Sequence, residues 1–200
     1  HYEICKVIIT NVNDKNPARN DGVTPLYIAA QNGHYEIFKL IIANVDDKNP
    51  ARPNGVTPLY IAAEIGHYEI CKAIVSNVND KNPAINDGAT PLFIAAQNGH
   101  YEICKLIIAN VDDKNPAKPN GNTPLSIAAH MGHYQICKLI ASNVLDKNPA
   151  NNDGVTPLHL AAKMGHFETF KLIFESLAGV NKRNPGVYGG YTPLHIAAEM

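Results

Sequence analysis

Apolar residues occur in pairs of short clusters, separated by polar turns, along the whole chain. In one pair, residues 26–30 form the first cluster and residues 37–42, at helical spacing, form the second. Thr24 and Pro25 predict a helix start, because a threonine side chain caps free N–H groups and proline at the first helical position loses no hydrogen bond. Gly33 predicts the helix end, since glycine adopts the left-handed conformation without strain. The pattern therefore predicts two short helices in each unit.

The unit repeats with a nearly constant period. Thr-Pro-Leu recurs every 33 residues, with a final interval of 36, beginning at Thr24, Thr57, Thr90, Thr123, Thr156 and Thr192. Helices below about 12–15 residues are marginal alone in water, so burial must come from neighbouring units. Paired alanines keep one face of each first helix thin enough for close packing, at positions 29/30, 62/63, 95/96, 128/129, 161/162 and 197/198. We therefore expect a stack with contacts between nearest neighbours. The longer last interval predicts a second helix that gains nearly a turn and ends at Gly179.

The segments between units carry turn signals. Asn49 before Pro50 predicts extended backbone, and Pro-Asn-Gly at 53–55 predicts a tight turn, so this linker should project as a β-like finger. Residues 24–56 and 90–122 differ at only four positions, whereas the unit between them carries Asn-Asp-Gly in its finger. The larger building block is therefore a pair of repeats.

Gly-x-Thr-Pro-Leu, x-Ala-Ala, Gly-His and the 33-residue period together resemble the ankyrin repeat over the whole chain. The resemblance implies an all-α repeat solenoid, in which stacked helix-turn-helix units carry β-hairpin-like finger loops. We expect a single ankyrin-repeat domain, 1–200, with repeats at about 1–19 (second helix only), 20–52, 53–85, 86–118, 119–151, 152–187 and 188–200 (first helix only). The residue after Thr-Pro-Leu is usually His in the family, but here it is Tyr27, Tyr60, Phe93, Ser126, His159 and His195. Segments such as 44–50 also replace the Gly-Ala-Asp-Val-Asn that usually follows the second helix.

Composition and charge narrow the function. Hydrophobic residues make up 45% of the chain and charged residues 18%, which favours a folded protein over a disordered one. Lys and Arg number 17 against 18 Asp and Glu, so we expect neither nucleic-acid binding nor electrostatic attraction to a membrane. No apolar run approaches the roughly 20 residues that span a bilayer, so we expect no direct membrane insertion.

The four cysteines share one position of the repeat with two phenylalanines; the residues are Cys5, Phe38, Cys71, Cys104, Cys137 and Phe170. Stacking spaces equivalent positions by about 10 Å, which is too far for a disulfide. We interpret these cysteines as buried hydrophobic residues. Free thiols favour a reducing compartment, and we expect a cytoplasmic protein.

Other polar patterns predict no chemistry. His67 and Cys71 stand four residues apart on one helical face, but two ligands are too few for zinc, so we expect no metal. Lys48 and its equivalents form a ladder, yet Asp47 and its equivalents precede them, which favours a solvated, mixed-charge edge over a phosphate-binding stripe. Near-identical repeats do not bring a nucleophile, a base and an acid to one point, so we expect no catalytic residue, no enzyme and no cofactor.

In ankyrin proteins the finger turn and the end of the first helix line the concave groove and finger tips that meet partners. The resemblance therefore implies a set of candidate protein-binding residues: Val23, Gln31, Asn32, Val56, Glu64, Ile65, Ala89, Gln97, Asn98, Asn122, His130, Met131, Val155, Lys163, Met164, Tyr188 and Tyr191. Ile65, Met131 and Met164 are apolar at an otherwise polar position, so they either form an exposed binding patch or cover neighbouring helices.

The sequence favours a non-catalytic protein–protein interaction scaffold that binds a partner of unknown identity. The alternative is an architectural spacer or spring within a longer chain such as a channel, a toxin or a cytoskeletal adaptor, which the near-identity of alternate units supports. Both terminal repeats lack one helix, which leaves apolar faces uncovered. We therefore also expect that copies of the chain can associate end to end through these faces.

Overall fold

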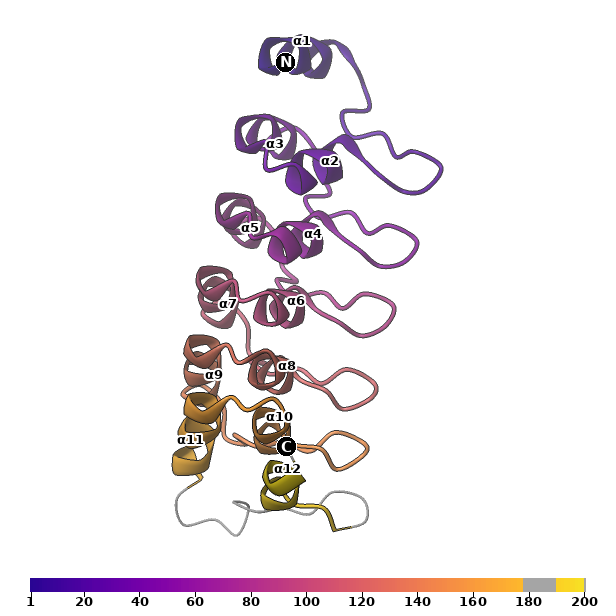
Figure 1. Ribbon diagram of the computed structural model, residues 1–200. Coiled ribbons are helices and arrows are strands. Elements are labelled where there is room, and N and C mark those ends of the chain that lie inside the picture. Colours follow the sequence, from indigo (N-terminus) through magenta and orange to yellow (C-terminus); the bar gives the residue numbers. More distant parts are fainter. Residues whose placement is uncertain (178–189, 200) are drawn as a thin grey trace. The chain divides into compact units, whose positions relative to one another are not determined.

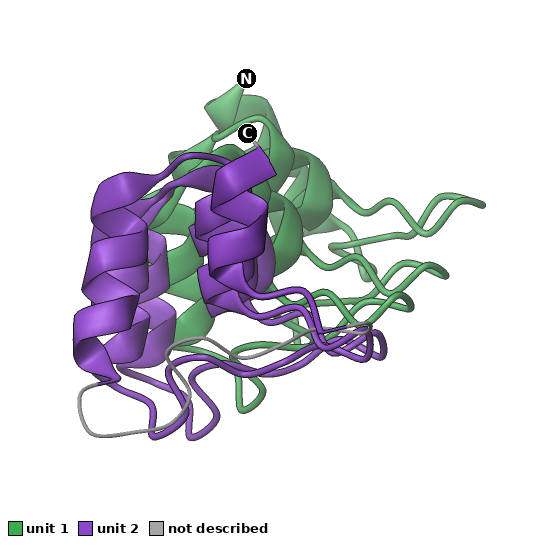
Figure 2. Ribbon diagram, turned by 60° about the horizontal axis from the view of Figure 1, so that its bottom comes forward, with its two compact units in different colours: residues 1–91 green, residues 92–200 purple. Residues whose placement is uncertain are grey.

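The computed structural model describes residues 1–177 and 190–199. These residues form twelve α-helices and no β-strand. The chain divides into two compact units, His1–Pro91 and Leu92–Met200, which are coloured separately in Figure 2. Each unit is built from paired short helices, as the two apolar clusters of the repeat predict.

In unit 1 the first helices of successive repeats pack against each other, and so do the second helices (Figure 1). Helix α2 contacts both α3 and α4, α4 contacts α5, and α3 contacts α1 and α5. The bounds are α1 Tyr2–Asn11, α2 Pro25–Gln31, α3 Tyr35–Ile42, α4 Pro58–Ile65 and α5 Tyr68–Val75.

Unit 2 has the same arrangement. Helix α8 contacts α9 and α10, α10 contacts α11 and α12, and α9 contacts α7 and α11. The bounds are α6 Pro91–Gln97, α7 Tyr101–Ile108, α8 Pro124–Met131, α9 Tyr134–Ala141, α10 Pro157–Lys163, α11 Phe167–Ser176 and α12 Pro193–Glu199. Helix α11 has 10 residues against 8 in α9, in line with the predicted extension, while its predicted end at Gly179 lies outside the described residues.

Two side chains cap the start of each of the first helices α2, α4 and α8. Thr57 Oγ1 accepts a hydrogen bond from the Tyr60 N–H at 3.2 Å, as the Thr-Pro-Leu motif predicts. Asn49, from the preceding linker, accepts a second one from the Leu59 N–H at 2.8 Å. Proline at the first helical position has no N–H, so the two caps pair the N–H groups of the second and third helical residues. Asparagines Asn16, Asn115 and Asn148 cap their helices in the same way, at 2.8, 2.8 and 3.0 Å.

Lysine closes the second helix where the family usually has glycine. Lys48 Nζ donates to the Ile42 carbonyl at 2.6 Å and also to the Val45 carbonyl. Lys81 and Lys114 donate to the Val78 and Val111 carbonyls, in the turns that follow their helices, at 3.0 and 3.1 Å. The expectation of a solvated lysine edge is therefore wrong, because these lysines are half-buried and bond backbone carbonyls at the helix end or just beyond it.

Gly-His joins successive repeats. His67 Nε2 bonds the Gln31 carbonyl of the preceding repeat at 3.2 Å, and His133 Nε2 bonds the Gln97 carbonyl at 3.0 Å. The glycine is required because a Cβ on Gly33 would lie 2.6 Å from the His67 ring, and because its φ is +69°.

The fingers are tight turns closed by two hydrogen bonds. In the finger at 52–56, the Arg52 N–H donates to the Val56 carbonyl at 3.0 Å and the Gly55 N–H donates to the Arg52 carbonyl at 2.8 Å. These two bonds close the turn as in a β-hairpin, but the described residues continue them into no β-strand.

Alternate fingers are linked differently, which explains the paired-repeat pattern. The Asn86 N–H donates to the Asn54 carbonyl of the preceding finger at 3.1 Å. Pro53 stands at the equivalent place one repeat earlier and has no N–H, so the Asp21 carbonyl accepts from Arg52 Nε instead, at 3.3 Å. The guanidinium of Arg52 also lies over the Tyr27 ring, 5.2 Å from its centroid.

Three of the four cysteines are buried, as predicted. Cys71, Cys104 and Cys137 are fully buried thiols, and Cys5 is a half-buried one. Phe38, at the same position of the repeat, is also fully buried.

Candidate functional site

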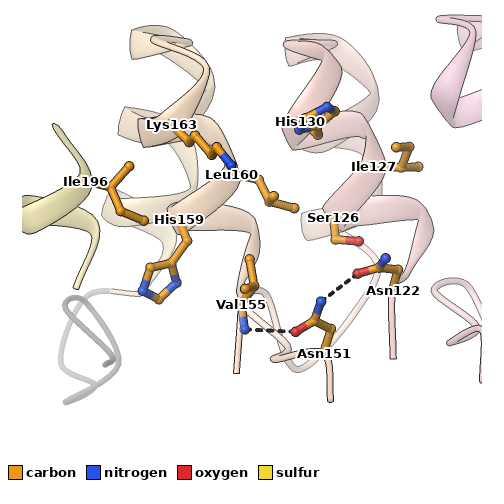
Figure 3. Close-up of a pocket in the computed structure, with 10 residues that line it drawn as sticks. All are labelled: Asn122, Ser126, Ile127, His130, Asn151, Val155, His159, Leu160, Lys163 and Ile196. Atoms are coloured by element: carbon orange, nitrogen blue, oxygen red, sulfur yellow. Dashed lines mark hydrogen bonds between the residues drawn. The ribbon is translucent and has the colours of Figure 1, made fainter. Parts of the chain in front are cut away.

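A cavity of about 400 Å³ lies in unit 2 beside the first helices α8, α10 and α12 (Figure 3). We call it the unit-2 pocket, and its lining residues are Asn122, Ser126, Ile127, His130, Asn151, Val155, His159, Leu160, Lys163 and Ile196. Its volume falls in the range of about 300–1,000 Å³ that is typical of ligand pockets.

Apolar side chains from three successive repeats line the unit-2 pocket. Ile127 lies on α8, Leu160 on α10 and Ile196 on α12, and all three are half-buried. At the same position of the other repeats, Ile61 and Ile94 are 8% and 7% exposed, whereas Ile28 is 39% exposed. The apolar edge is therefore accessible at α8, α10 and α12 but buried at α4 and α6.

Asparagines fix the polar side of the pocket. Asn151 Oδ1 accepts hydrogen bonds from the Val155 N–H at 2.9 Å and the Asp153 N–H at 3.0 Å. Its amide group donates to Asn122 Oδ1 at 3.0 Å, as Figure 3 shows. Asn122 is thus held with its acceptor occupied, which leaves its NH₂ group to donate to a ligand.

His159 is a structural residue rather than a ligand-binding one. It is buried, its Nδ1 accepts from the Thr156 N–H at 3.2 Å and lies 2.9 Å from Thr156 Oγ1, and its Nε2 lies 3.2 Å from the Tyr191 carbonyl. Because Nδ1 accepts, Nε2 carries the proton and donates to Tyr191. His159 thereby joins the start of α10 to the next repeat.

The basic side of the pocket comes from His130 and Lys163. His130 Nδ1 is buried and has no hydrogen-bond partner among the described residues. Lys163 is exposed, and in Figure 3 its side chain extends from α10 toward α8. None of the described residues that line this pocket is acidic.

Tyr191, at the start of the last described repeat, is half exposed and bonded to an acid. Its hydroxyl donates to Glu199 Oε1 at 2.5 Å. This hydrogen bond to the carboxylate, and the carboxylate's charge, raise the pKa of Tyr191.

The structure brings four of the predicted binding residues together in the unit-2 pocket: Asn122, His130, Val155 and Lys163. The others stand outside this pocket. Gln31, Asn32, Ile65, Asn98, Met131, Met164 and Tyr191 are exposed, whereas Val56, Glu64 and Gln97 are half-buried. Tyr188 lies outside the described residues.

Val23 and Ala89 are corrections to the predicted set. They are 8% and 3% exposed, so their side chains are not available to a partner. The turn places the residue after the finger glycine inward, and the next finger covers it closely. A Cβ on Gly22 would lie only 2.6 Å from Pro53 Cδ.

Most of the apolar residues that line the pocket were not predicted from the sequence. Ile127, Leu160 and Ile196 follow the Thr-Pro-Leu motif and read as core positions in the helical pattern. Asn151 also went unnoticed, although it replaces the Arg or Lys that stands before the Pro-Asn-Gly fingers. That substitution was the available signal.

Paired short helices, each packed on the equivalent helices of the next repeat, define a helical tandem-repeat protein. The family model for ankyrin repeats in three copies matches residues 1–84, 44–115, 76–151, 92–184 and 145–200. These matches together cover the whole chain, and it belongs to the ankyrin repeat family. A search of curated proteins gives no match.

No helix in residues 1–177 and 190–199 combines the length and the apolar character needed to cross a membrane. Within the same residues, no cluster of three or more His, Cys, Asp or Glu side chains is arranged to hold a metal ion.

Proposed function

We propose that the chain is a non-catalytic protein–protein interaction scaffold that holds a segment of a partner protein in the unit-2 pocket. Ankyrin repeats are generally protein–protein interaction modules. The observation that carries the proposal is the pocket itself, where accessible apolar side chains, an oriented amide and a basic side chain meet at equivalent faces of successive repeats.

The proposal also includes the domain organisation, the type of partner and the cellular compartment. Residues 1–200 act as one ankyrin-repeat domain, and the partner is a protein rather than nucleic acid or lipid, in keeping with the formal charge of −1. Free, buried thiols at Cys71, Cys104 and Cys137 support a reducing compartment such as the cytoplasm.

Selection from random peptides tests this function. A phage library of random dodecapeptides is panned against the whole chain, and enriched peptides are measured by fluorescence anisotropy. We expect peptides whose affinity falls at least tenfold in Leu160→Glu, which places a charge on the apolar wall, and is unchanged in the matched control Leu139→Glu on α9. Thermal unfolding of both variants shows whether each one is folded.

A second function, an architectural spacer, is favoured by the links between fingers. The Asn86 side chain donates to the Pro53 carbonyl at 3.1 Å, and the Asn152 side chain donates to the Pro119 carbonyl at 3.0 Å. These repeated links stiffen pairs of repeats without involving a ligand. Failure to enrich any peptide whose binding depends on Leu160 supports the spacer over the binding scaffold.

Copies of the chain are also proposed to associate end to end. Helix α1 exposes Ile4 and Val7 at 60% and 62%, and toward the other end Phe167 of α11 and Leu194 of α12 are exposed at 68% and 71%. Sedimentation velocity over a concentration series should show larger species that Val7→Glu abolishes. A single monomeric species at every concentration contradicts this association.

A further inference from the structure

We propose that the unit-2 pocket selects a partner segment in which a carboxylate side chain lies next to an apolar one. This inference rests on the proposed function, because it names the class of ligand for the same pocket. It follows from three properties of the lining residues: their charge, their unsatisfied polar groups and their apolar wall.

The charge of the pocket departs from the repeat pattern. The position of Lys163 is occupied by Gln31, Glu64 and Gln97 in the earlier full repeats, and it becomes basic only at His130 and Lys163. Neither α8 nor α10 contains an Asp or a Glu. Lys163 therefore places a positive charge at a cavity with no acid among its described lining residues, and Glu199, at the equivalent position of α12, is bonded to the Tyr191 hydroxyl, which favours an anionic ligand.

Lys163 differs from the other lysines near the fingers and helix ends. Lys118 lies over the Phe93 ring, 5.0 Å from its centroid, and Lys114 Nζ donates to the Val111 carbonyl. Lys163 is exposed and has no ion pair or hydrogen bond to any described residue. Its ammonium group is therefore available to a carboxylate without breaking an internal contact.

Unsatisfied polar groups lie beside this charge. The Asn122 NH₂ group is held in place through the bond from Asn151 to Asn122 Oδ1, and it donates to no described residue. His130 Nδ1 is buried and has no hydrogen-bond partner among the described residues. The Asn122 NH₂ group is not buried in this way, so it is the group suited to donate to an oxygen atom of a bound segment.

The apolar wall gives the second half of the specificity. Ile127, Leu160 and Ile196 present half-buried aliphatic side chains to a cavity of about 400 Å³, which has room for a pair of side chains rather than a folded element. An aliphatic side chain beside the carboxylate would be buried there. The described residues that line the pocket include one lysine and no arginine, which favours a carboxylate over a phosphate group, since phosphate recognition commonly uses arginine.

Two short peptides that differ by one charge test the inference. The probes are acetyl-Leu-Glu-Leu-amide and acetyl-Leu-Gln-Leu-amide, titrated into the ¹⁵N- and methyl-labelled whole chain and followed by NMR. We expect the Glu peptide to bind about three- to fivefold more tightly than the Gln peptide, the range for an exposed ion pair. The resonances that move should include the Asn122 side-chain amide and the methyl groups of Ile127 and Leu160.

Lys163→Met should remove the preference for Glu over Gln, while Lys171→Met, at an exposed lysine on α11, should keep it. Equal affinities of the two peptides, shifts outside the pocket, or no binding of either peptide would overturn the carboxylate assignment. Tighter binding of acetyl-Leu-phosphoserine-Leu-amide would overturn it in favour of phosphate. In each of these cases, a panned peptide whose binding depends on Leu160 still supports the proposed function, so the two failures are distinguishable.

Discussion

At the residue scale, this chain uses its polar side chains mainly to satisfy its own backbone. Lys48 closes a helix, Asn49 caps the next one, and Asp47 Oδ1 accepts from the Asn49 N–H at 3.0 Å. Three consecutive residues of one motif thus serve three different backbone sites. Charged residues that read as a surface ladder in the sequence are therefore part of the fold.

Replacing Lys48 by methionine keeps the apolar stem and removes the helix-closing hydrogen bonds. We expect the free energy of unfolding to fall by about 1–2 kcal/mol, because charge-assisted hydrogen bonds at a half-buried site are lost. Lys39→Met, at an exposed position of α3, is the control and should change stability by less than about 0.5 kcal/mol. Urea denaturation of the two variants measures the difference, and equal effects would contradict a capping role.

The buried thiols make stability depend on pH in the alkaline range. Burial raises the pKa of Cys71, Cys104 and Cys137 from about 9 to about 12. In the unfolded chain the thiols ionise from pH 9, whereas in the folded chain they stay protonated. Ionisation then favours the unfolded state, so stability is intact below pH 9 and is lost as pH rises toward 12. Each thiol contributes a loss of about 1.4 kcal/mol per pH unit in this window.

Denaturation of wild type and of Cys104→Ala between pH 7 and 11 checks this sign. The variant should be less stable at pH 7 but should lose stability less steeply above pH 9. Parallel curves would show that the thiol does not titrate differently on folding. Burial also raises the pKa of Tyr60 to about 12, assisted by Glu64 and Asp87, which adds a loss of the same sign above pH 10.

At the element scale, the link between neighbouring fingers alternates along the chain. The Asn152 N–H donates to the Asn120 carbonyl at 3.1 Å, as Asn86 does to Asn54. Pro53 offers no such donor, and a side chain, Arg52, reaches across instead. The paired period of the sequence therefore has a physical cause in the hydrogen bonds between fingers.

Asn152→Pro tests this alternation. Proline already occupies the equivalent position in the 53–55 finger, so the backbone accommodates it. The change removes a main-chain and a side-chain hydrogen bond and should lower the free energy of unfolding by about 1–2 kcal/mol. Asn20→Pro is the matched control, because the Asn20 N–H donates to no described residue. It should be neutral or slightly stabilising, and a comparable loss in both variants would contradict the proposed link.

The joint between repeats at Gly-His is testable with two glycines of similar backbone conformation. Gly132 and Gly165 have φ of +73° and +69°, so alanine is strained equally at both. A Cβ on Gly132 would lie 2.7 Å from the His166 ring, whereas one on Gly165 meets nothing within 4 Å among the described residues. We expect Gly132→Ala to lose about 1 kcal/mol more than Gly165→Ala, through displacement of His166 from the His130 carbonyl. Equal melting temperatures of the two variants would show that the contact between residue 132 and His166 does not affect stability.

How far the sequence predicted the structure depends on whether a feature is local. Thr57, Gly33 and Cys71 have roles that their own neighbours in the repeat dictate, and the structure confirms these roles. Val23 was misassigned because its burial depends on the finger of the next repeat. Leu160 was missed because its exposed edge depends on what the adjacent repeats leave uncovered. Whether such a side chain is buried or exposed therefore depends on packing between repeats, which the periodicity of the sequence does not show.

At the scale of the whole molecule, each compact unit is held together by contacts between adjacent repeats. In unit 1, α3 contacts α1 and α5, and in unit 2, α10 contacts α8 and α12. In such an arrangement stability is approximately a sum of repeat and interface contributions. A local defect should therefore remain local.

Hydrogen exchange of Gly132→Ala checks this locality. Amide exchange, followed by mass spectrometry, should accelerate in α8, α9, α10 and α11, which adjoin the substitution, and should be unchanged in α2 to α5. Acceleration by the same factor in every helix would show instead that the chain opens as one cooperative body.

The asparagine cap has a consequence for anyone who wishes to exchange repeats between proteins. Asn49 belongs to one repeat, but the helix whose Leu59 N–H it satisfies belongs to the next. A chimera joined at Thr-Pro-Leu would carry the helix without the asparagine that caps it. The segment to transfer therefore starts at Asp-Lys-Asn-Pro, upstream of Thr-Pro-Leu.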